Sequence, residues 1–415
     1  MAKSKNKSEK SPKKVVASSK GEQRDKLIDK VYDLINYGDA PAYFLDQPEL
    51  SPSDIVDWIS TGDPILDIYV SNRVNGGIPV GRITEINGLE SSGKSLLIGH
   101  ILKETQKKDG IAVLIDTEFS VDRNFLEAIG VDLSKMIYVP TNLIENAFQI
   151  IENIIETVRK ENSDRLITVA VDSIMGATDK TELEGDWAKK GYATQKSIVL
   201  GRAMRKITET IAKHRIALVF TNQLRSKIGV MFGDPWTTSG GKAIPFHSSL
   251  RLRLKMMSKI KSGDKVLGIK TNCGVIKSRL GSMYNSCNFD IYFDRGIDAE
   301  NTWFEQGKSV GAIIKAKALT DPNLPEGPKN KYKEVKGYFM LANDPERKRF
   351  NASTFASIAL VDNANKKFIL DEIAEHVLLK YSSDKEAINK ELIEYGEVGE
   401  LDDGEDVEQK IKNKE

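Results

Sequence analysis

Hydrophobic and polar positions alternate with two different periods between Ile59 and Lys255. Short apolar runs are separated by longer segments in which apolar residues recur every three or four positions. The short runs include RITEING, IAVLIDTE, LITVAVDS and IALVFTNQ, and the longer segments include SLLIGHILKETQKK and NAFQIIENIIETVRK. Nearly continuous apolar runs are typical of parallel strands buried on both faces, and the longer period is typical of covering helices. The pattern predicts an α/β fold with a mainly parallel sheet covered by helices.

The flanks of this core have different patterns. Leu27, Val31, Leu34 and Ile35 follow helical spacing and precede the Pro-rich stretch DAPAYFLDQPELSPSD. VLGIKTNCGVIKSR and SCNFDIYFD resemble further strands, and a helical pattern, FILDEIAEHVLLKYSS, follows a Pro-, Gly- and Lys-rich region near the C-terminus. We predict five parts: a basic disordered tail (1–22), an N-terminal helix and linker for subunit packing (23–58), the core (59–300), a small C-terminal α+β domain (301–385) and an acidic tail (386–415).

Composition narrows the class of protein only slightly. Sixty-one basic and sixty acidic residues give a net charge of +1, so overall charge indicates neither nucleic acid nor membrane. The sequence contains no long apolar run and no secretory pattern, which predicts a cytoplasmic protein without a membrane partner. Two cysteines, Cys273 and Cys287, suit a reducing compartment, and the four histidines lack the spacing of metal ligands.

The stretch GLESSGKS, from Gly88 to Ser95, matches the phosphate-binding pattern G-x-x-x-x-G-K-[ST] between a predicted strand and a predicted helix. Its glycines allow backbone N–H groups to converge on phosphate oxygens at a helix N-terminus. Lys94 would add charge at the outer phosphates, and Ser95 would offer a hydroxyl to Mg²⁺. The alternative is a simple glycine turn before a helix.

Acidic residues follow two of the predicted strands. Asp172 ends LITVAVDS, where a carboxylate can hold the magnesium shell, although an Asp at this place can also cap a helix. Asp116 and Glu118 end IAVLIDTEF on the same side of that strand. We favour Glu118 as the group that orients the attacking water, because it lies farther toward the ligand crevice of an open α/β sheet. Helix capping is the alternative for this pair.

Several longer motifs together resemble one family. ISTGDPILD, GGIPVGRITEINGLESSGKS, LIDTEFSVD, VAVDS, ELEG, AMRK, TNQLRSKIGVMFGDPWTTSGGKAIPFHSSLRLRL and VIKSR follow one another as in bacterial RecA recombinases. The resemblance extends from about Ile59 to Gly296. It implies a RecA-like P-loop ATPase core, with ATP and Mg²⁺ as cofactors. The chain differs from the usual family pattern at Leu89 and Phe119, where proline and histidine are usual, and its first DNA loop is about one residue longer.

The resemblance also implies roles for individual residues. Glu118 would be the catalytic carboxylate, and Gln223 would sense the γ-phosphate. Lys277 and Arg279 would reach the ATP of the adjacent subunit, as cations that stabilise transition-state charge in trans. Ser95 and Asp172 would hold the metal. The residues expected to bind the nucleotide are Gly88, Glu90, Ser91, Ser92, Gly93, Lys94, Ser95, Asp122, Phe125 and Asp172.

Two loops would contact DNA by the same resemblance: the first is ELEGDWAKKGYATQK and the second is LRSKIGVMFGDPWTTSGGKA. Both set basic groups among apolar side chains and glycines, a composition that suits a single strand without base-specific recognition. Each loop can also be interpreted as a flexible crossover with incidental lysines. The expected DNA-binding residues are Lys189, Lys190, Lys196, Arg205, Arg225, Lys227, Gly229, Val230, Met231, Phe232, Trp236, Gly240, Gly241 and Lys242.

We therefore expect an ATP-dependent recombinase that forms a helical filament on single-stranded DNA and exchanges strands with homologous duplex. Mediator and single-strand-binding proteins are further expected partners. Two other classes stay open at this point: a hexameric helicase with the same ATPase architecture, and a nucleotide-gated mediator that does not exchange strands. The acidic tail around Asp402 to Glu408 is interpreted either as a competitor of DNA for the basic loops or as a solubilising tail.

Overall fold

The computed structural model describes residues 26–35, 42, 44, 55, 57–161, 164–184, 192–227, 234–238, 240–281, 285–319 and 332–379. The chain separates into two compact units, Met1–Asp54 and Ile55–Glu415. The first unit contains α1 (Lys26–Ile35), a helix with no buried residue. Leu27 and Leu34 on this helix are 66% and 75% exposed. The predicted helical segment is therefore present, and these two apolar side chains are largely exposed. The predicted tails 1–22 and 386–415 lie outside the described residues.

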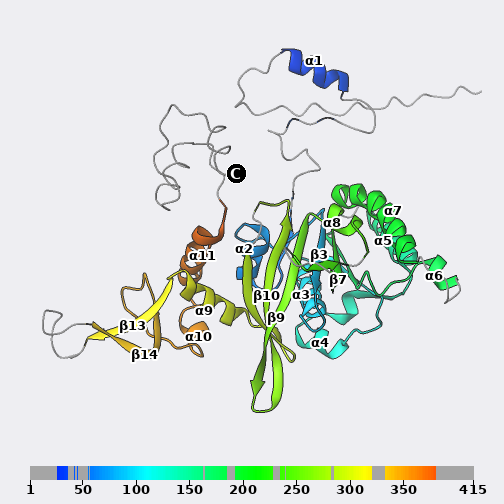
Figure 1. Cartoon of the computed structure of the whole chain (residues 1–415). Helices are drawn as coiled ribbons and strands as arrows, with labels where there is room; N and C mark the ends of the chain where they lie inside the picture. The colour runs from blue at the N-terminus through cyan, green and yellow to red at the C-terminus, as the bar shows by residue number, and fades with distance from the viewer. Residues whose placement is uncertain are drawn as a thin grey trace, which may run out of the picture. The chain divides into compact units, whose positions relative to one another are not determined.

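The second unit is built on a ten-stranded sheet in the part of the chain that the structure describes (Figure 1). Its strands lie in the order β12, β11, β10, β9, β3, β7, β6, β4 and β5, with β8 paired to β7 outside this path. The strands are β3 (Ile83–Gly88), β4 (Ile111–Asp116), β5 (Met136–Pro140), β6 (Ile167–Asp172), β7 (Ile216–Ser226), β8 (Trp236–Thr238), β9 (Leu250–Ser262), β10 (Lys265–Ser278), β11 (Ser286–Tyr292) and β12 (Gly296–Ile297).

Pairing within this sheet changes from parallel to antiparallel at β9. Strands β9, β3, β7, β6, β4 and β5 are parallel to one another. On the other side of β9, strands β10, β11 and β12 continue the sheet in antiparallel pairs. Strand β8 pairs antiparallel with the end of β7. The sheet is thus mainly parallel, as the nearly continuous apolar runs predict, and the α/β fold class is confirmed. The two-residue strands β1 (Trp58–Ile59) and β2 (Ile78–Pro79) pair antiparallel in a separate small sheet.

Helices cover both faces of the sheet. On one face, buried side chains of α5 (Ile144–Lys160), α7 (Tyr192–Lys213) and α8 (Ala243–His247) pack on alternate residues of the central strands. On the other, α2 (Pro64–Ser71) and α3 (Lys94–Lys107) pack on the remaining residues. Shorter helices are α4 (Arg123–Ala128), the 3₁₀ turn Leu133–Lys135 and α6 (Lys180–Glu184). Parallel strands need such two-sided cover because both of their faces are apolar.

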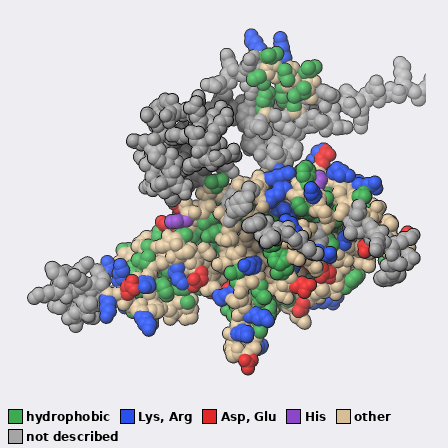
Figure 2. All heavy atoms as spheres, viewed as in Figure 1, with side chains coloured by type: hydrophobic (Ala, Val, Ile, Leu, Met, Phe, Trp, Pro, Cys, Tyr) green, Lys and Arg blue, Asp and Glu red, His purple; other side chains and the backbone are tan. Residues whose placement is uncertain are grey.

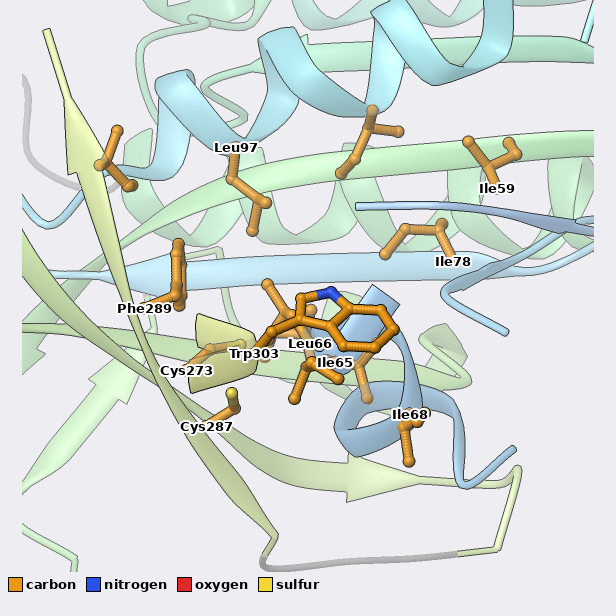
Figure 3. Packing of buried hydrophobic residues seen from close by; sticks show 14 of the residues in the cluster. Ile59, Ile65, Leu66, Ile68, Ile78, Leu97, Cys273, Cys287, Phe289 and Trp303 are labelled. Atoms are coloured by element: carbon orange, nitrogen blue, oxygen red, sulfur yellow. The ribbon is translucent and has the colours of Figure 1, made fainter. Parts of the chain in front are cut away.

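The C-terminal elements share the core of the second face. They are α9 (Ala299–Ser309), β13 (Ile313–Leu319), β14 (Tyr332–Leu341), α10 (Phe355–Ile358) and α11 (Asn363–Val377). Figure 3 shows Trp303 of α9 packed among Leu66, Cys273 and Cys287. The β13–β14 hairpin forms its own two-stranded sheet. The domain limits proposed from the sequence for this region stay predictions.

The two cysteines are register partners on β10 and β11 and are both buried. Burial raises the pKa of the Cys273 thiol to about 12, so it stays protonated and acts as a small apolar residue. Among the described helices, none combines the length and the hydropathy that crossing a bilayer requires.

Candidate functional site

The phosphate-loop motif lies between β3 and α3, at the carboxyl edge of the parallel strands. Gly93 caps α3 with a φ of +95°, and Ser91 has a φ of +57°. A Cβ at Gly93 would lie 2.7 Å from Cδ1 of Ile291, and one at Gly88 would lie 2.4 Å from Oγ of Ser92. Both glycines are therefore required by close packing, and at Gly93 also by the backbone angle. The loop leads directly into the N-terminus of α3, where free backbone N–H groups would favour a phosphate.

Lys94 and Ser95 lie together with Asp172 at this point. The Lys94 ammonium donates to the carbonyl oxygens of Gly88 at 3.2 Å and Leu89 at 2.9 Å. Burial lowers the pKa of Lys94, and the carboxylates of Asp172, Glu118 and Glu90 oppose this shift. The site thus concentrates one cation and three acids around the start of α3.

Asp172 is held by two hydroxyl groups. Thr221 of β7 donates to its Oδ1 at 2.5 Å, and Ser95 also forms a side-chain hydrogen bond with it. Burial raises the pKa of Asp172, and these two hydrogen bonds counteract the shift. Asp172 ends β6 and does not cap α6, which begins at Lys180. The capping alternative therefore does not apply to α6, and the metal-holding role stays a prediction.

Asp116 and Glu118 occupy different environments. Asp116 is 1% exposed and accepts backbone N–H groups from Glu118, Ser120 and Val121 as well as the Tyr138 hydroxyl. Its carboxylate is therefore used in holding the turn after β4. Glu118 is exposed, and its Oε1 accepts the Ser173 hydroxyl at 2.5 Å. Of the two, only Glu118 has an exposed side chain, and its catalytic role stays a prediction.

A cavity of about 270 Å³ opens beside the phosphate loop. The cavity is lined by Ser95, Asp172, Asp122 and Phe125, so residues proposed to bind the nucleotide and the metal line one space. Asp122 also caps α4 by accepting the N–H groups of Asn124 and Phe125. Phe293, just after β11, lines the cavity as well and is 46% exposed. The sequence pattern missed Phe293, because it lies about 170 residues from the other aromatic residue of the cavity and belongs to no motif.

Gln223 lies next to the phosphate loop through sheet pairing. It is the register partner of Gly88 across β3 and β7, and it is partly buried. The sequence pattern places Gln223 at the end of a strand, but β7 continues to Ser226 and pairs there with β8. Gln223 therefore stands between the nucleotide edge and the segment proposed to bind DNA.

Lys277 and Arg279 lie apart from the cavity, beside α8. Lys277 donates to the carbonyl oxygens of Pro245 at 2.7 Å and Phe246 at 3.0 Å, and Arg279 donates to that of Phe246 at 3.2 Å. Burial and the neighbouring Arg279 lower the pKa of Lys277 to about 8. Burial lowers the pKa of His247, and the nearby cations Arg205, Arg279 and Lys277 lower it further. Figure 2 shows basic side chains gathered on the face over α8 and the adjoining part of α7.

The residues proposed for DNA contact are only partly within the described ranges. Lys189, Lys190, Gly229, Val230, Met231 and Phe232 lie outside them. Arg205, Arg225, Lys227 and Lys242 are exposed, and Trp236 and Gly240 are partly buried. Arg225 pairs with Thr237 in the β7–β8 ladder, which brings both ends of the second loop together. Asp234 in this loop is paired with Arg253 at 2.8 Å.

Lys196 differs from the other proposed DNA contacts. It is only 9% exposed, and its ammonium donates to the carbonyl oxygens of Met175 and Ala177. Two of its three N–H donors are used in this way, and burial separates the ammonium from a DNA phosphate at the surface. The direct contact expected from the sequence is therefore not formed in this conformation, because the lysine satisfies its charge inside the protein.

The residues fit a nucleoside triphosphate with Mg²⁺. The loop would offer backbone amides and Lys94 a cation, and the buried Ser92 hydroxyl has no hydrogen-bond partner among the residues that the structure describes. The described residues include no cluster of three or more His, Cys, Asp or Glu that could hold a metal alone. A magnesium ion here would depend on Ser95, Asp172, phosphate oxygens and water, which is the coordination Mg²⁺ prefers. A larger cavity, of about 500 Å³, lies near β13 and β14 and contains none of these residues.

Comparison with known proteins identifies relatives of the whole core. The model of the RecA N-terminal domain family matches residues 37–298. Protein RecA of Chlorobium chlorochromatii is 36% identical over 258 residues, 62% of this chain and 70% of that protein. Protein RecA of Herpetosiphon aurantiacus is 34% identical over 309 residues, 74% and 84% of the two chains. Protein RecA of Ehrlichia canis is 33% identical over 325 residues, 78% and 88% of the two chains.

Proposed function

Because this chain belongs to the RecA family, we propose that it is an ATP-dependent recombinase that assembles on single-stranded DNA and exchanges strands with homologous duplex. A role in recombination and DNA repair follows from the family. The observation that carries the finer proposal is the meeting of Lys94, Ser95, Asp172 and Glu118 at one sheet edge. That edge is joined through Gln223 and β7 to the TTSGGKA segment.

The chain's own residues divide the work of hydrolysis. The amides of the loop from Gly88 to Gly93 and the N-terminus of α3 bind phosphate oxygens, and Lys94 leaves its two carbonyl partners to join them. Ser95 and Asp172 hold the metal, which when bound supplies Lewis acidity at the phosphate oxygens. Glu118 orients the attacking water and accepts its proton. Its hydrogen bond from Ser173 keeps the carboxylate turned toward the site.

Assembly completes the site with cations from a second copy. Lys277 and Arg279 lie beside α8 and not at the cavity, so within one chain the transition-state charge lacks them. A head-to-tail interface that does not close makes a helical filament, and it can bring these cations to a neighbour's phosphates. The exposed apolar residues of α1 offer a second surface for such packing.

The first test is ATP hydrolysis with and without single-stranded DNA, in the wild type and in Glu118→Gln. The proposal predicts strong stimulation by DNA in the wild type, and a loss of about 100-fold or more in Glu118→Gln, in line with general-base catalysis. ATP-dependent DNA binding should survive in that variant. Glu156→Gln on α5 is a matched control, since Glu156 is 67% exposed and pairs only with Lys160 among the bonds the structure shows.

The result separates the recombinase from the other two classes. Hydrolysis that is indifferent to single-stranded DNA would count against the recombinase and favour a mediator. Closed rings under the electron microscope, with unwinding of a forked duplex, would favour a helicase. Open helical filaments that form with ATP and single-stranded DNA support the proposal.

A further inference from the structure

The ammonium group of Lys196 is buried between helix α7 and the segment that follows β6. It donates to the carbonyl oxygen of Met175 at 2.9 Å and also to that of Ala177. A buried cation is costly unless it is hydrogen-bonded, so these two carbonyls compensate for its loss of water. The lysine thereby fixes residues 175–177 to the beginning of α7.

The segment held by Lys196 is in contact with Glu118. A Cβ at Gly176 would lie 2.6 Å from Cγ of Glu118 and 3.4 Å from its Oε1, so the Gly176 backbone borders this side chain directly. The Gly176 N–H donates to Oγ of Ser173 at 3.1 Å, and that hydroxyl donates to Oε1 of Glu118 at 2.5 Å. The position of the carboxylate thus depends on where residues 173–177 lie.

The same part of α7, and Met175 itself, contact the segment proposed to bind DNA. A Cβ at Gly241 would lie 3.0 Å from Oγ of Ser197, and one at Gly240 would lie 3.1 Å from Leu200 and 3.9 Å from Sδ of Met175. Both glycines belong to TTSGGKA. Movement of this segment against α7 therefore acts on the turn of helix that carries Lys196.

The charged side chains that shift the pKa of Lys196 lie in the segment after β6 and at the base of the second loop. Burial lowers its pKa, the carboxylates of Glu182 and Asp179 oppose the shift, and Arg225 adds to it. Arg225 is exposed at the base of the second loop and is a proposed phosphate contact. A phosphate bound at Arg225 would offset the repulsion that Arg225 exerts on the buried ammonium.

We propose that Lys196 is a positioning residue for Glu118, through which the DNA-binding segments set the geometry of the catalytic carboxylate. This inference rests on the proposed function, since it requires hydrolysis at Glu118 and DNA at the segment containing Gly240 and Gly241. Lys196 does not touch the nucleotide or DNA in this role. It transmits the position of α7 to residues 175–177 by two hydrogen bonds, and Gly176 passes that position to Glu118.

The test uses Lys196→Met, which keeps the length of the side chain and removes its donors, and Lys196→Arg, which keeps donors and charge. We expect kcat at saturating ATP and single-stranded DNA to fall about tenfold or more in Lys196→Met, because small misplacements of a catalytic group are costly. The KM for ATP and the Kd for single-stranded DNA should stay within about threefold, since binding groups are untouched. Lys196→Arg should recover a substantial part of kcat.

Lys206→Met is the matched control on the same helix. Lys206 is 72% exposed and pairs with Glu152, so its removal should leave kcat unchanged within about twofold, as is usual for a surface ion pair. Thermal unfolding of each variant reports whether the protein is folded at the assay temperature. Rates are then compared per folded molecule.

A double-mutant cycle isolates the path through Glu118. In a Glu118→Gln background, Lys196→Met should lower the residual rate by less than about twofold, because the group it positions is already gone. An undiminished tenfold loss in that background would overturn the proposal, since Lys196 would then act by another route.

Two other outcomes would also overturn it. A weaker Kd for DNA with a shallower salt dependence, and a normal kcat at saturating DNA, would make Lys196 a phosphate contact. A lower unfolding temperature with normal kcat per folded molecule would make it a purely structural residue. Failure of the proposed function is distinguishable from both, because it would appear in the wild type and in Glu118→Gln before any Lys196 variant is compared.

Discussion

Gly176→Ala perturbs the contact between the backbone after β6 and the proposed catalytic carboxylate. The added Cβ would lie 2.6 Å from Cγ of Glu118 and 2.7 Å from Oγ1 of Thr117. Ordinary contacts between carbon atoms are about 3.5–4.0 Å long, so the Glu118 side chain must move by about 1 Å. Glu118 is exposed and can rotate outward, whereas Thr117 is 3% exposed and its hydroxyl donates to the carbonyl oxygen of Ser173, so relieving the second contact also costs folding free energy. Thermal unfolding of the variant therefore accompanies the assay, and rates are compared per folded molecule.

The expected loss falls on the rate of hydrolysis. A misplacement of about 1 Å at a reacting group costs on the order of 100-fold, or about 2.7 kcal/mol of transition-state stabilisation. The assay is steady-state ATP hydrolysis at saturating single-stranded DNA, with nucleotide binding measured in parallel and expected to be nearly unchanged. Gly201→Ala on α7 is the control, because a Cβ there would meet its nearest neighbours only at 3.7 and 3.9 Å. A Gly176→Ala rate within about twofold of wild type would refute the placement of Glu118 against Gly176.

Three further predictions concern stability and DNA affinity. Burial raises the pKa of Asp63 to about 6, above its ordinary 3.8, so its contribution to stability is present below about pH 4 and is lost as pH rises through 6. Asp63→Asn should therefore gain stability relative to wild type between pH 5 and 8, by roughly 2–3 kcal/mol, and a pH-independent difference in thermal unfolding would contradict this. Phe355→Ala, which removes a ring 5.3 Å from both Phe304 and Phe350, should cost about 3–5 kcal/mol in urea unfolding. Phe246→Ala is its control: this side chain is 67% exposed, and its removal should change the free energy of unfolding by less than about 0.5 kcal/mol. Arg225→Ala should weaken single-stranded DNA binding and reduce the slope of log K against log salt by about 0.7, and an unchanged slope would show that Arg225 meets no phosphate.

The buried parallel strands could be predicted from the sequence, because burial on both faces leaves few polar residues in them. ITEING, IAVLID and ITVAVD all become parallel strands, and SLLIGHILKETQK becomes most of α3. The end of β7 could not be predicted in this way. Arg225 and Ser226 are exposed and polar, and their strand conformation depends on pairing with β8, which follows an intervening loop.

The site residues follow the same rule: those in local motifs could be predicted, and those placed by distant parts of the chain could not. Lys94, Ser95 and Asp172 could be placed together because each belongs to a local motif at the end of a strand. Phe293 could not, because its place in the cavity is set by the antiparallel strands that follow β9. Lys196 looks like a loop cation in the sequence. Only tertiary structure shows that its ammonium faces the Met175 and Ala177 carbonyls and not solvent.

Strand exchange itself is the most direct test of the central claim. The measurement follows transfer of a labelled strand from a linear duplex to a single-stranded circle, with ATP and Mg²⁺ present and with either homologous or unrelated duplex. The account predicts joint molecules and exchanged product with homologous duplex only, and none of either when ATP is omitted. Filament formation and DNA-stimulated hydrolysis without any exchanged product would contradict it, because such a protein would bind DNA under ATP control without being a recombinase.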